Sequence, residues 1–523
     1  MTVYKNGDAV CKACVPNKRQ IEWYGRERSI FFHFGMNTFT GREWGDGTES
    51  PSLFNPTDCD VDSWVEAISR AGFACAILTA KHHDGFCIWP SKDTEHSIKN
   101  SPYKNGNGDI VREFTDACKK YGVKAGIYLS PWDRHEPTWG TPAYNDYYAN
   151  QLTELMTNYG KIWECWWDGA GSTEASYDWE RWANIVRQNQ PDAVIFGSLG
   201  ATPWVDVRWV GNEKGIAGEP CYATIDAHSL VVENTDELNH GKIDGDSFIP
   251  AETDVSIRPG WFYHSDKDDM VRSPQNLMEL YFNSVGRGSG LLLNIPPNSL
   301  GRLGKTDVQS ILEFDRRLTK LYQGDLTKNA KIVSEGCVTR AIFDKPTKIN
   351  TVLLGEKIEL GQHITEATLR ALVNGEWKEL YTVFSVGYKR LIRFDELLAS
   401  ELEIEITGSY GEATLDKLSA YLVDSEEIEE KRQKITPAST KIDGGVVEID
   451  LGGIFTFDLI SGENLGEQAY KLYLFNGTDY DLVKEGRTKG FFKCKLNTPS
   501  DGAYRLKLVF EYDIPKEFTF ELE

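Results

Sequence analysis

The sequence predicts an α/β protein, with a (β/α)8-like barrel followed by C-terminal β-sandwich domains. In about the first 300 residues, short apolar runs alternate with segments of helical periodicity, which is typical of parallel strands joined by crossover helices. No GxGxxG motif follows the first apolar run, so a dinucleotide-binding sheet is disfavoured and a barrel is favoured. After about Lys328, short alternating strands with turn residues replace the helices, as in a β-sandwich.

The barrel strands are predicted from short, largely apolar runs. They are Ser29–Phe39, Ala74–Phe86, Lys124–Asp133, Lys161–Gly171, Ala193–Ser198 and Gly290–Pro297. The helices are predicted from apolar residues at helical spacing, in several cases with a glycine as the stop signal. They are Val61–Gly72, Asp109–Gly122, Ala143–Gly160, Asp178–Gln190, Ser273–Gly286 and Lys305–Gln323. The pattern is irregular up to about Trp261, so we expect an irregular second half of the barrel.

Three domains are predicted along the chain. The barrel covers residues 1–325, a β-sandwich domain covers 328–425, and a second β-sandwich domain covers 436–523. The acidic segment Asp424–Lys434 is predicted to link the two β domains. Asn374-Gly375 and Asn476-Gly477 both lie between apolar strands, which suggests that the two domains are similar. The second domain could resemble a carbohydrate-binding module; a purely structural role is the alternative.

Composition and charge limit the partners of this chain. It has 523 residues and a formal charge of −22, which repels phosphate backbones and argues against nucleic acid, whereas a neutral sugar is compatible. No apolar run is long enough to span a membrane and no signal peptide is visible. We therefore expect a cytoplasmic protein without membrane contact, although a trimmed secreted form would look the same. Cys11 and Cys14 form a CxxC pair, but no second pair completes a zinc site.

Polar residues gather where the predicted strands end, which is where barrels of this class carry their chemistry. They are His33, His82, His83, Asp133 and Asp168. Asp168 follows an aromatic run with Trp166 and Trp167 and precedes Gly-Ala-Gly, which lets the backbone turn away and leaves the carboxylate in the barrel mouth. A cap or turn role is the alternative for such an aspartate. The adjacent histidines either lie at a strand end or bind a metal, because neighbouring strand residues point in opposite directions.

A sugar hydrolase needs a second carboxyl group. The candidates are Glu213, Glu219, Glu252 and Asp254. Glu213 follows an apolar segment and precedes a glycine closely, so its context resembles that of Asp168. A solvated loop charge is the alternative for each of these residues.

Six segments carry a resemblance to a known family. They are FFHFGMNTFTGREWGDG, TAKHHDGFCIWPS, GIYLSPWDRH, WWDGAG, RWVGNEKG and SIRPGWFYH. Together they resemble the α-L-fucosidases of glycoside hydrolase family 29, over roughly Gln20 to Gln323. The resemblance implies a retaining exo-fucosidase in which Asp168 is the nucleophile. The GNE motif resembles the subgroup that cleaves α-1,3 and α-1,4 fucosyl bonds in branched, Lewis-type sugars, which implies Glu213 as the acid/base, with Glu252 as the runner-up.

The resemblance also implies the residues that hold the substrate, a fucosylated oligosaccharide or glycoconjugate. For the fucose ring they are His33, Glu43, Trp44, His82, His83, Tyr128, Arg258 and Trp261. The long segment Pro131–Tyr148 is predicted to contact a galactose branch. Its contacts would be Trp132, Asp133, His135 and Trp139. We expect neither a metal nor another cofactor.

Two other classes of function remain open from the sequence. A metal-dependent hydrolase barrel could use His33, His82, His83 and Asp168 as ligands, although the usual spaced His-x-His pair is missing. A non-catalytic glycan-binding protein would keep the same pocket. Metal analysis and release of free fucose from an aryl fucoside separate these classes.

Overall fold

The computed structural model describes most of the chain. The described residues are 14–171, 176–197, 199–227, 235–428, 435–455, 457, 459–463, 465, 468–475, 480–488, 491–495, 503–515 and 520–522. Cys11, and with it the predicted CxxC pair, lies outside them, and so does the Asn476-Gly477 turn. Among the described residues, no helix is long and apolar enough to cross a bilayer.

Eight parallel strands close into a barrel in the order β1-β10-β9-β6-β5-β4-β3-β2. They are β1 (Arg28–Phe32), β2 (Cys75–Lys81), β3 (Lys124–Leu129), β4 (Glu164–Trp166), β5 (Val194–Gly197), β6 (Val207–Trp209), β9 (Ala251–Ser256) and β10 (Gly290–Asn294). The strands are short and nearly fully buried, as expected when both faces of a parallel sheet are covered. The predicted fold class is therefore confirmed.

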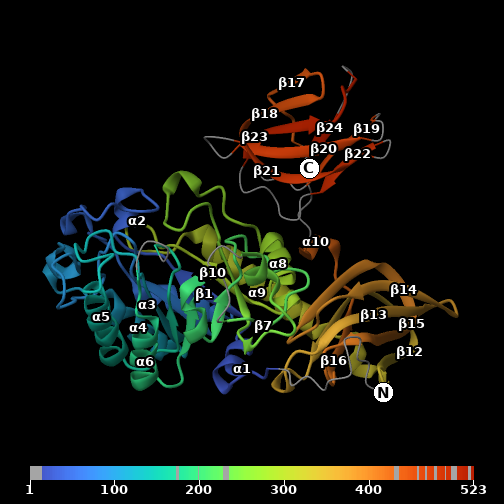
Figure 1. The fold of residues 1–523 in the computed structure, drawn as a ribbon, viewed down its shortest axis with the longest axis horizontal. Helices are drawn as coiled ribbons and strands as arrows, with labels where there is room; N and C mark the ends of the chain where they lie inside the picture. Colours follow the sequence, from blue (N-terminus) through green and yellow to red (C-terminus); the bar gives the residue numbers. More distant parts are fainter. Residues whose placement is uncertain are drawn as a thin grey trace. The chain divides into compact units, whose positions relative to one another are not determined.

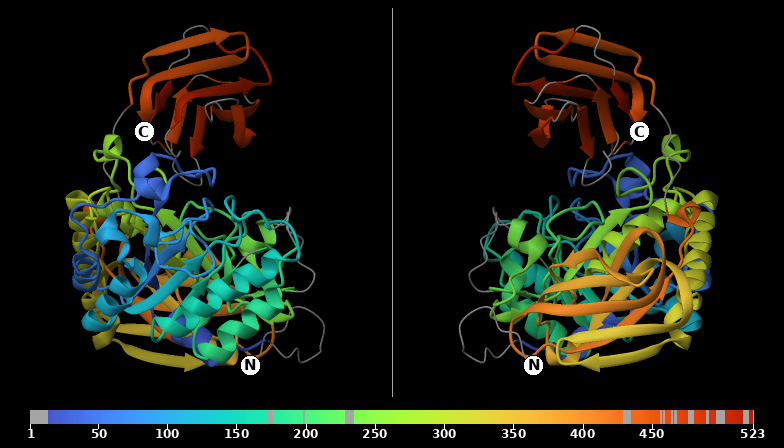
Figure 2. Two further views of the ribbon diagram at one scale, coloured as in Figure 1. Left: turned by 90° about the vertical axis from the view of Figure 1, so that its left-hand side faces the viewer. Right: turned by 90° about the vertical axis from the view of Figure 1, so that its right-hand side faces the viewer.

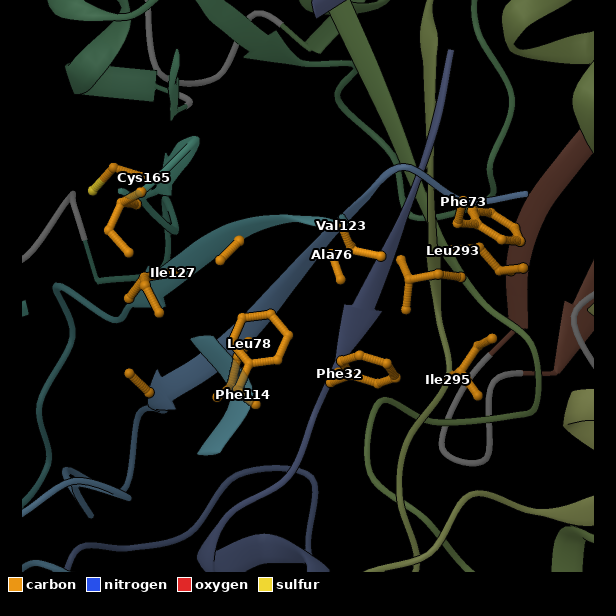
Figure 3. Packing of buried hydrophobic residues seen from close by; sticks show 14 of the residues in the cluster. Phe32, Phe73, Ala76, Leu78, Phe114, Val123, Ile127, Cys165, Leu293 and Ile295 are labelled. Atoms are coloured by element: carbon orange, nitrogen blue, oxygen red, sulfur yellow. The ribbon is translucent and has the colours of Figure 1, made fainter. Parts of the chain in front are cut away.

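Amphipathic helices cover the outside of the barrel. They are α3 (Val61–Arg70), α4 (Ile110–Tyr121), α5 (Tyr144–Asn158), α6 (Trp179–Asn189), α8 (Pro274–Asn283) and α9 (Lys305–Gln323), and Figure 1 shows α3 to α6 side by side. Aspartates at the N-caps of α3, α4 and α6 accept backbone N–H groups, which stabilises a helix start. Between helices and strands lies an apolar layer that includes Phe32, Leu78, Phe114 and Ile127 (Figure 3).

The second half of the barrel departs from regular repeats, as predicted. In the described residues between β5 and β6, the 3-10 helix η4 (Leu199–Trp204) takes the place of a longer covering helix. Between β6 and β9 lie β7 (Thr224–Ile225), α7 (Thr235–His240) and β8 (Ser247–Phe248). Further short helices of the barrel domain are α1 (Lys18–Tyr24), η1 (Pro51–Leu53), η2 (Ile98–Asn100) and η3 (Tyr103–Gly106) in its first half, and η5 (Ser265–Lys267) and η6 (Val285–Arg287) in its second half.

The predicted first strand, Ser29–Phe39, is wrong in its second part. β1 ends at Phe32, and a helix, α2 (Met36–Thr40), follows. The apolar run continues past the strand because Phe34 and Met36 are buried in the layer outside the barrel, where Phe34 packs edge-on against Trp64. The apolar run therefore indicates which residues are buried, and it does not indicate where the strand ends.

A first β domain follows the barrel. Its six-stranded antiparallel sheet contains β11 (Lys331–Glu335), β12 (Val338–Glu356), β13 (Ile364–Val373), β14 (Glu376–Val383), β15 (Arg390–Ser409) and β16 (Leu415–Tyr421), after η7 (Leu326–Asn329) and with η8 (Ile358–Leu360) inserted. The domain packs on the barrel (Figure 2). Tyr388 stacks on Tyr24 with ring centroids 4.7 Å apart, and the Lys389 ammonium pairs with Glu27. The short helix α10 (Ser425–Ile428) closes this unit, which spans Met1–Ile428.

Residues 429–523 form a second compact unit. Its described strands are β17 (Ser439–Asp443), β18 (Val446–Phe455), β19 (Leu459–Glu463), β20 (Ala469–Phe475), β21 (Tyr480–Arg487), β22 (Phe491–Lys495), β23 (Ala503–Phe510) and β24 (Phe520–Leu522). They form a five-stranded and a three-stranded antiparallel sheet around an apolar core that includes Leu472 and Leu506. The predicted domain boundaries and the predicted sugar binding of this unit stay predictions.

The barrel interior contains two buried carboxyl groups near the N-terminal ends of the strands. Glu252 accepts hydrogen bonds from the indole N–H groups of Trp166 at 3.1 Å and Trp23 at 3.3 Å. Among the described residues, neither carboxyl oxygen of Glu164 has a hydrogen-bond partner. Burial raises the pKa of Glu252 to about 7, and burial together with the charge of Glu252 raises the pKa of Glu164 well above its ordinary value.

This pair makes stability depend on pH. A glutamate with a pKa of 4.5 when unfolded and about 7 when folded keeps its proton longer in the native state, so the free energy of unfolding falls as pH rises through that window. Glu164→Gln removes one of the two like charges. We expect it to match the wild type near pH 5 and to raise Tm by about 2–4 °C at pH 8. The exposed Glu180→Gln is the control; calorimetric Tm differences that do not grow with pH would contradict the prediction.

Candidate active site

Asp168 lies directly beyond the end of β4, where the chain leaves the barrel. The Tyr128 hydroxyl donates to Asp168 Oδ2 at 3.0 Å, and the backbone N–H of Ala170 donates to Oδ1 at 2.8 Å. Each carboxyl oxygen therefore has a hydrogen-bond donor that holds the side chain in place. The Asp168 side chain is 27% exposed, so a ligand can reach it. A turn residue with a purely structural role would not need this access.

Glu213 is the second acid at the mouth, in the segment after β6. The Trp261 indole donates to Glu213 Oε2 at 3.3 Å. Partial desolvation raises the pKa of the carboxyl group; the Trp261 hydrogen bond opposes this, and the charges of Asp168 and Glu43 raise the pKa further. A carboxyl group with a raised pKa holds its proton to higher pH, as an acid catalyst must.

Three histidines lie at the mouth of the barrel, just beyond the ends of β1 and β2. His33, His82 and His83 are nearly fully buried, and the rings of His82 and His83 lie 4.1 Å apart between centroids. Burial lowers the pKa of all three side chains, that of His33 to about 3. The structure places His82 and His83 at a strand end, as one of the two predicted alternatives required. Neutral imidazoles at this depth are suited to hydrogen bonding with an uncharged ligand.

One side of the barrel mouth, called the rim below, is formed by Glu43, Trp44 and Trp261. Glu43 accepts the backbone N–H of Trp261 at 2.7 Å and contacts His264 Nε2 at 2.9 Å. The Trp261 ring packs against His33 with centroids 5.0 Å apart, while Trp44 is 56% exposed. Gly260 has a φ of +85°, and a side chain there would collide with the Glu43 carboxyl group. The rim thus offers aromatic faces next to the two acids.

The other predicted acids lie elsewhere. Glu252 is buried in the barrel interior between indole groups, so the structure does not bring the runner-up acid to the mouth. Glu219 pairs with Arg390 and accepts the Tyr381 hydroxyl of the first β domain. Asp254 is buried, accepts the Trp209 indole at 3.0 Å, and has a pKa raised well above its usual value by burial and by the charge of Glu213.

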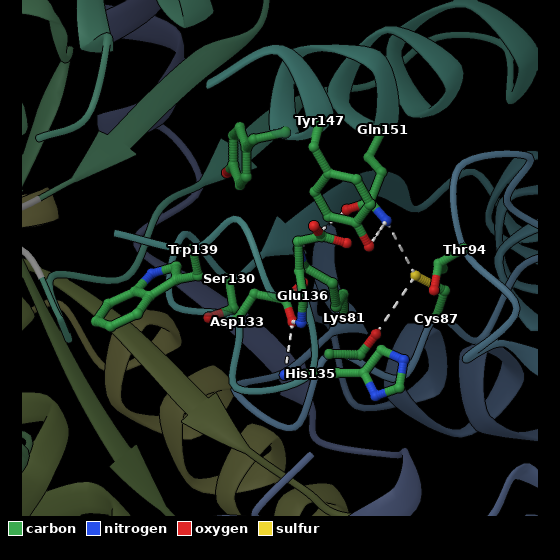
Figure 4. Close-up of polar contacts among 12 residues, drawn as sticks. Lys81, Cys87, Thr94, Ser130, Asp133, His135, Glu136, Trp139, Tyr147 and Gln151 are labelled. Carbon is green, nitrogen blue, oxygen red and sulfur yellow. Dashed lines mark hydrogen bonds and ion pairs between the residues drawn. The ribbon is translucent and has the colours of Figure 1, made fainter. Parts of the chain in front are cut away.

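Arg258 and Asp133 both have ion-pair partners inside the protein. The Arg258 guanidinium is buried and donates to Asp307 and Asp268, each at 2.7 Å. Asp133 is buried in an ion pair with Lys81 at 2.8 Å, near Gln151 (Figure 4). The sugar contacts predicted for Arg258 and Asp133 stay predictions.

Trp132, His135 and Trp139 lie on the loop after β3 as predicted. Trp132 packs edge-on against Trp44 at 5.4 Å and lies 5.0 Å from the His83 ring. Trp139 lies 6.3 Å from Trp132 and donates its indole N–H to Tyr177. His135 stacks on His96 and bonds the Gly47 carbonyl oxygen. Asp133 Oδ1 accepts the backbone N–H groups of His135 and Glu136, so its structural role is to hold this loop.

The two tryptophans before Asp168 are buried. Trp166 points into the barrel and stacks on Phe196 with centroids 4.0 Å apart. Trp167 is fully buried on the outer side, against Trp179. The alternation of strand residues explains both positions. Aromatic rings near the acids come instead from Trp44, Trp132 and Trp261.

Three residues around the site were missed by the sequence analysis. Lys81 forms the buried ion pair with Asp133, Asn294 contacts His33, and Ser130 contacts His83. Asn294 and Ser130 both lie at or just beyond a strand end, in β10 and after β3. That position is the signal that could have drawn attention to them.

The metal alternative lacks support in the described part of the chain, where no three histidine, cysteine or acidic side chains are grouped to hold an ion. His33 Nδ1 and His83 Nδ1 instead contact Asn294 and Ser130. Of the CxxC pair, the described Cys14 donates its thiol hydrogen to the Gly245 carbonyl oxygen.

Comparison with known proteins places the chain in a family. The family model described as alpha-L-fucosidase matches residues 11–320. Alpha-L-fucosidase 1 of Arabidopsis thaliana is 36% identical over 448 residues, which cover 78% of this chain and 87% of that protein. A crystal structure of a glycoside hydrolase 29 family member from an unknown rumen bacterium has a TM-score of 0.79 and 33% identity, covering 98% of this chain and 100% of its own. A family 29 fucosidase from Ruminococcus gnavus, solved in complex with fucose, has a TM-score of 0.71 and 30% identity, covering 81% and 98%.

A parallel barrel with two carboxyl groups among aromatic rings at its mouth has the arrangement expected of a glycoside hydrolase. With the family model matched over more than half of its length, the chain belongs to the α-L-fucosidases of glycoside hydrolase family 29.

Proposed function

We propose that this α-L-fucosidase is a retaining exo-enzyme that releases α-1,3- and α-1,4-linked fucose from branched, Lewis-type glycans. The observation that carries the mechanism is the contrast between the two acids. Asp168 has a donor on each oxygen, whereas partial burial raises the pKa of Glu213. A double displacement needs one carboxylate and one carboxylic acid at neutral pH.

In the first step Glu213 gives its proton to the glycosidic oxygen while Asp168 attacks the anomeric carbon. The bond between that carbon and the leaving oxygen breaks, and a covalent fucosyl–Asp168 ester forms. Positive charge develops on the ring during this step and is stabilised by the Asp168 carboxylate. The departing glycan leaves with the proton of Glu213 on its oxygen.

In the second step Glu213, now a carboxylate, removes a proton from water. The resulting hydroxide attacks the anomeric carbon and breaks the ester, so fucose leaves with the same anomeric configuration and Asp168 is regenerated. Glu213 has recovered its proton. The Tyr128 hydroxyl and the Ala170 N–H remain in place to receive the charge that returns to Asp168.

The fucose ring is proposed to lie between the histidines and the rim. His33, His82, His83, Glu43 and Trp261 supply polar and aromatic contacts within a few ångströms of one another. The aromatic surface of Trp44, Trp132 and Trp139 continues outward from this pocket. We propose that this surface binds the galactose branch, with His135 at its edge. The cytoplasmic location stays a prediction.

The substrate proposal predicts a large linkage preference. We expect kcat/KM for α-1,3/1,4-fucosylated trisaccharides to exceed that for α-1,2-fucosyl-galactose or an aryl fucoside by about 10-fold or more, because binding of the galactose branch contributes in the transition state. Trp132→Ala should remove most of this advantage without lowering the rate on the aryl fucoside comparably.

Trp377→Ala is the matched control, because Trp377 is 42% exposed on the first β domain. It should leave both rates unchanged. Equal kcat/KM on α-1,2 and α-1,3/1,4 substrates, or indifference to removal of the galactose branch, would refute the linkage proposal.

A further inference from the structure

The orientation of the Asn294 side chain is set by its neighbours. Its amide Nδ2 lies 2.8 Å from the Trp261 carbonyl oxygen and 2.9 Å from Ser256 Oγ. A carbonyl oxygen can only accept a hydrogen bond, so the amide nitrogen must lie on that side. The Asn294 Oδ1 atom therefore faces His33, where it also accepts the backbone N–H at 3.3 Å.

This orientation determines which nitrogen of His33 carries the proton. Nδ1 lies 2.9 Å from Asn294 Oδ1, an atom that can only accept, so Nδ1 must donate. Burial lowers the pKa of His33 to about 3, which leaves the ring neutral at pH 7 with a single proton. The other nitrogen, Nε2, then has a free lone pair and is a hydrogen-bond acceptor.

The same argument applies independently to His83. The Ser130 hydroxyl donates its one hydrogen to the Trp132 carbonyl oxygen at 2.7 Å. Ser130 Oγ lies 2.8 Å from His83 Nδ1 and has to accept from it. Burial outweighs the attraction of Asp168 and lowers the pKa of His83. His83 Nε2 is therefore also an acceptor.

Both acceptors lack a partner in the protein. Within the part of the chain that the structure describes, no residue hydrogen-bonds Nε2 of His33 or His83. His83 Nε2 lies 3.9 Å from Asp168 Oδ2, so two electron-rich atoms face each other without a hydrogen between them. A ligand group that donates a hydrogen bond would be stabilised there, and one that only accepts would not.

We propose that Asn294 and Ser130 are positioning residues that hold His33 and His83 as hydrogen-bond acceptors, so that the pocket selects its sugar through two hydroxyl groups that donate. This inference rests on the proposed binding of fucose at this site and adds the direction of two hydrogen bonds. Histidines in the opposite tautomer would donate from Nε2 to the lone pairs of the sugar oxygens. They would then select ligand groups that accept hydrogen bonds.

Modified ligands distinguish the two directions. Methyl α-L-fucoside is compared with analogues in which one ring hydroxyl is replaced by fluorine or by hydrogen, each measured as a competitive inhibitor of aryl fucoside hydrolysis. Fluorine can accept but cannot donate. We expect two ring positions at which fluorine and hydrogen weaken inhibition alike, by about 10-fold or more, because a buried acceptor loses its donor. Fluorine analogues that inhibit like the parent at every position would overturn the proposal.

The parent compound separates this test from the proposed function. If methyl α-L-fucoside itself does not inhibit at millimolar concentration, fucose binding at this site fails. If it inhibits and the analogue pattern is absent, only the direction of the hydrogen bonds is wrong.

Nitrogen NMR of the protein with labelled histidine gives a direct readout, with nine histidines in the chain. At pH 7 the neutral Nδ1–H form is expected for His33 and His83, with signals assigned through His33→Gln and His83→Gln. Ser130→Ala should lose that preference at His83, and Ser130→Thr should keep it. For His33, Asn294→Leu should lose the Nδ1–H preference and Asn294→Asp should keep it. A doubly protonated ring or the Nε2–H form at either histidine of the wild type would overturn the proposal, whatever the variants do to stability.

Discussion

Replacing Asp168 by alanine is expected to lower kcat by at least about 10³-fold, on aryl fucosides and oligosaccharides alike, because no other group can form the glycosyl ester. The fold should persist, since Asp168 lies beyond the end of β4 and is 27% exposed. A 2-fluoro fucosyl substrate, which forms the ester quickly and releases it slowly, should label Asp168 in the wild type. Steady-state kinetics and peptide mass spectrometry measure the two effects.

Asp192→Ala is the matched control for this prediction. Asp192 pairs with Lys161 on the surface before β5, at the opposite end of the barrel from the mouth. It should have the kinetics and the Tm of the wild type. A label found on another acid, or kcat within about 10-fold of wild type for Asp168→Ala, would reject the nucleophile assignment.

Much of the fold could be predicted from the sequence, because barrel strands and covering helices differ in length and in periodicity. The helix at Lys305–Gln323 agrees with α9 at both ends, and Val61–Gly72 exceeds α3 only at its C-terminal end. The segment Ser29–Phe39 failed because burial continues beyond β1 into α2. Hydrophobic residues indicate which positions are buried. Whether the backbone there is a strand or a helix depends on packing with distant parts of the chain.

The site could be predicted in its position but not in all of its roles. Asp168, Glu213 and the adjacent histidines lie together at the mouth because strand ends converge there. The sequence does not show the ion pairs of Arg258 and Asp133, because their partners, Asp307 and Lys81, are 49 and 52 residues away along the chain. Asn294 and Ser130 carry no charge, and only the three-dimensional contacts reveal which histidine atom each of them binds.

The loss of activity in Glu213→Ala is expected to depend on the leaving group of the substrate. Glu213→Ala should lower kcat/KM on a fucosylated oligosaccharide by about 10²- to 10⁴-fold, because a poor leaving group needs its proton in the first step. An aryl fucoside with a good leaving group should lose far less in that step. Azide should restore part of the aryl fucoside rate and yield fucosyl azide, since it attacks the ester without needing a base.

Glu252→Gln should show neither effect, because Glu252 is buried between the indoles of Trp23 and Trp166. If Glu252→Gln shows the leaving-group dependence and the azide rescue while Glu213→Ala does not, the acid/base role belongs to Glu252.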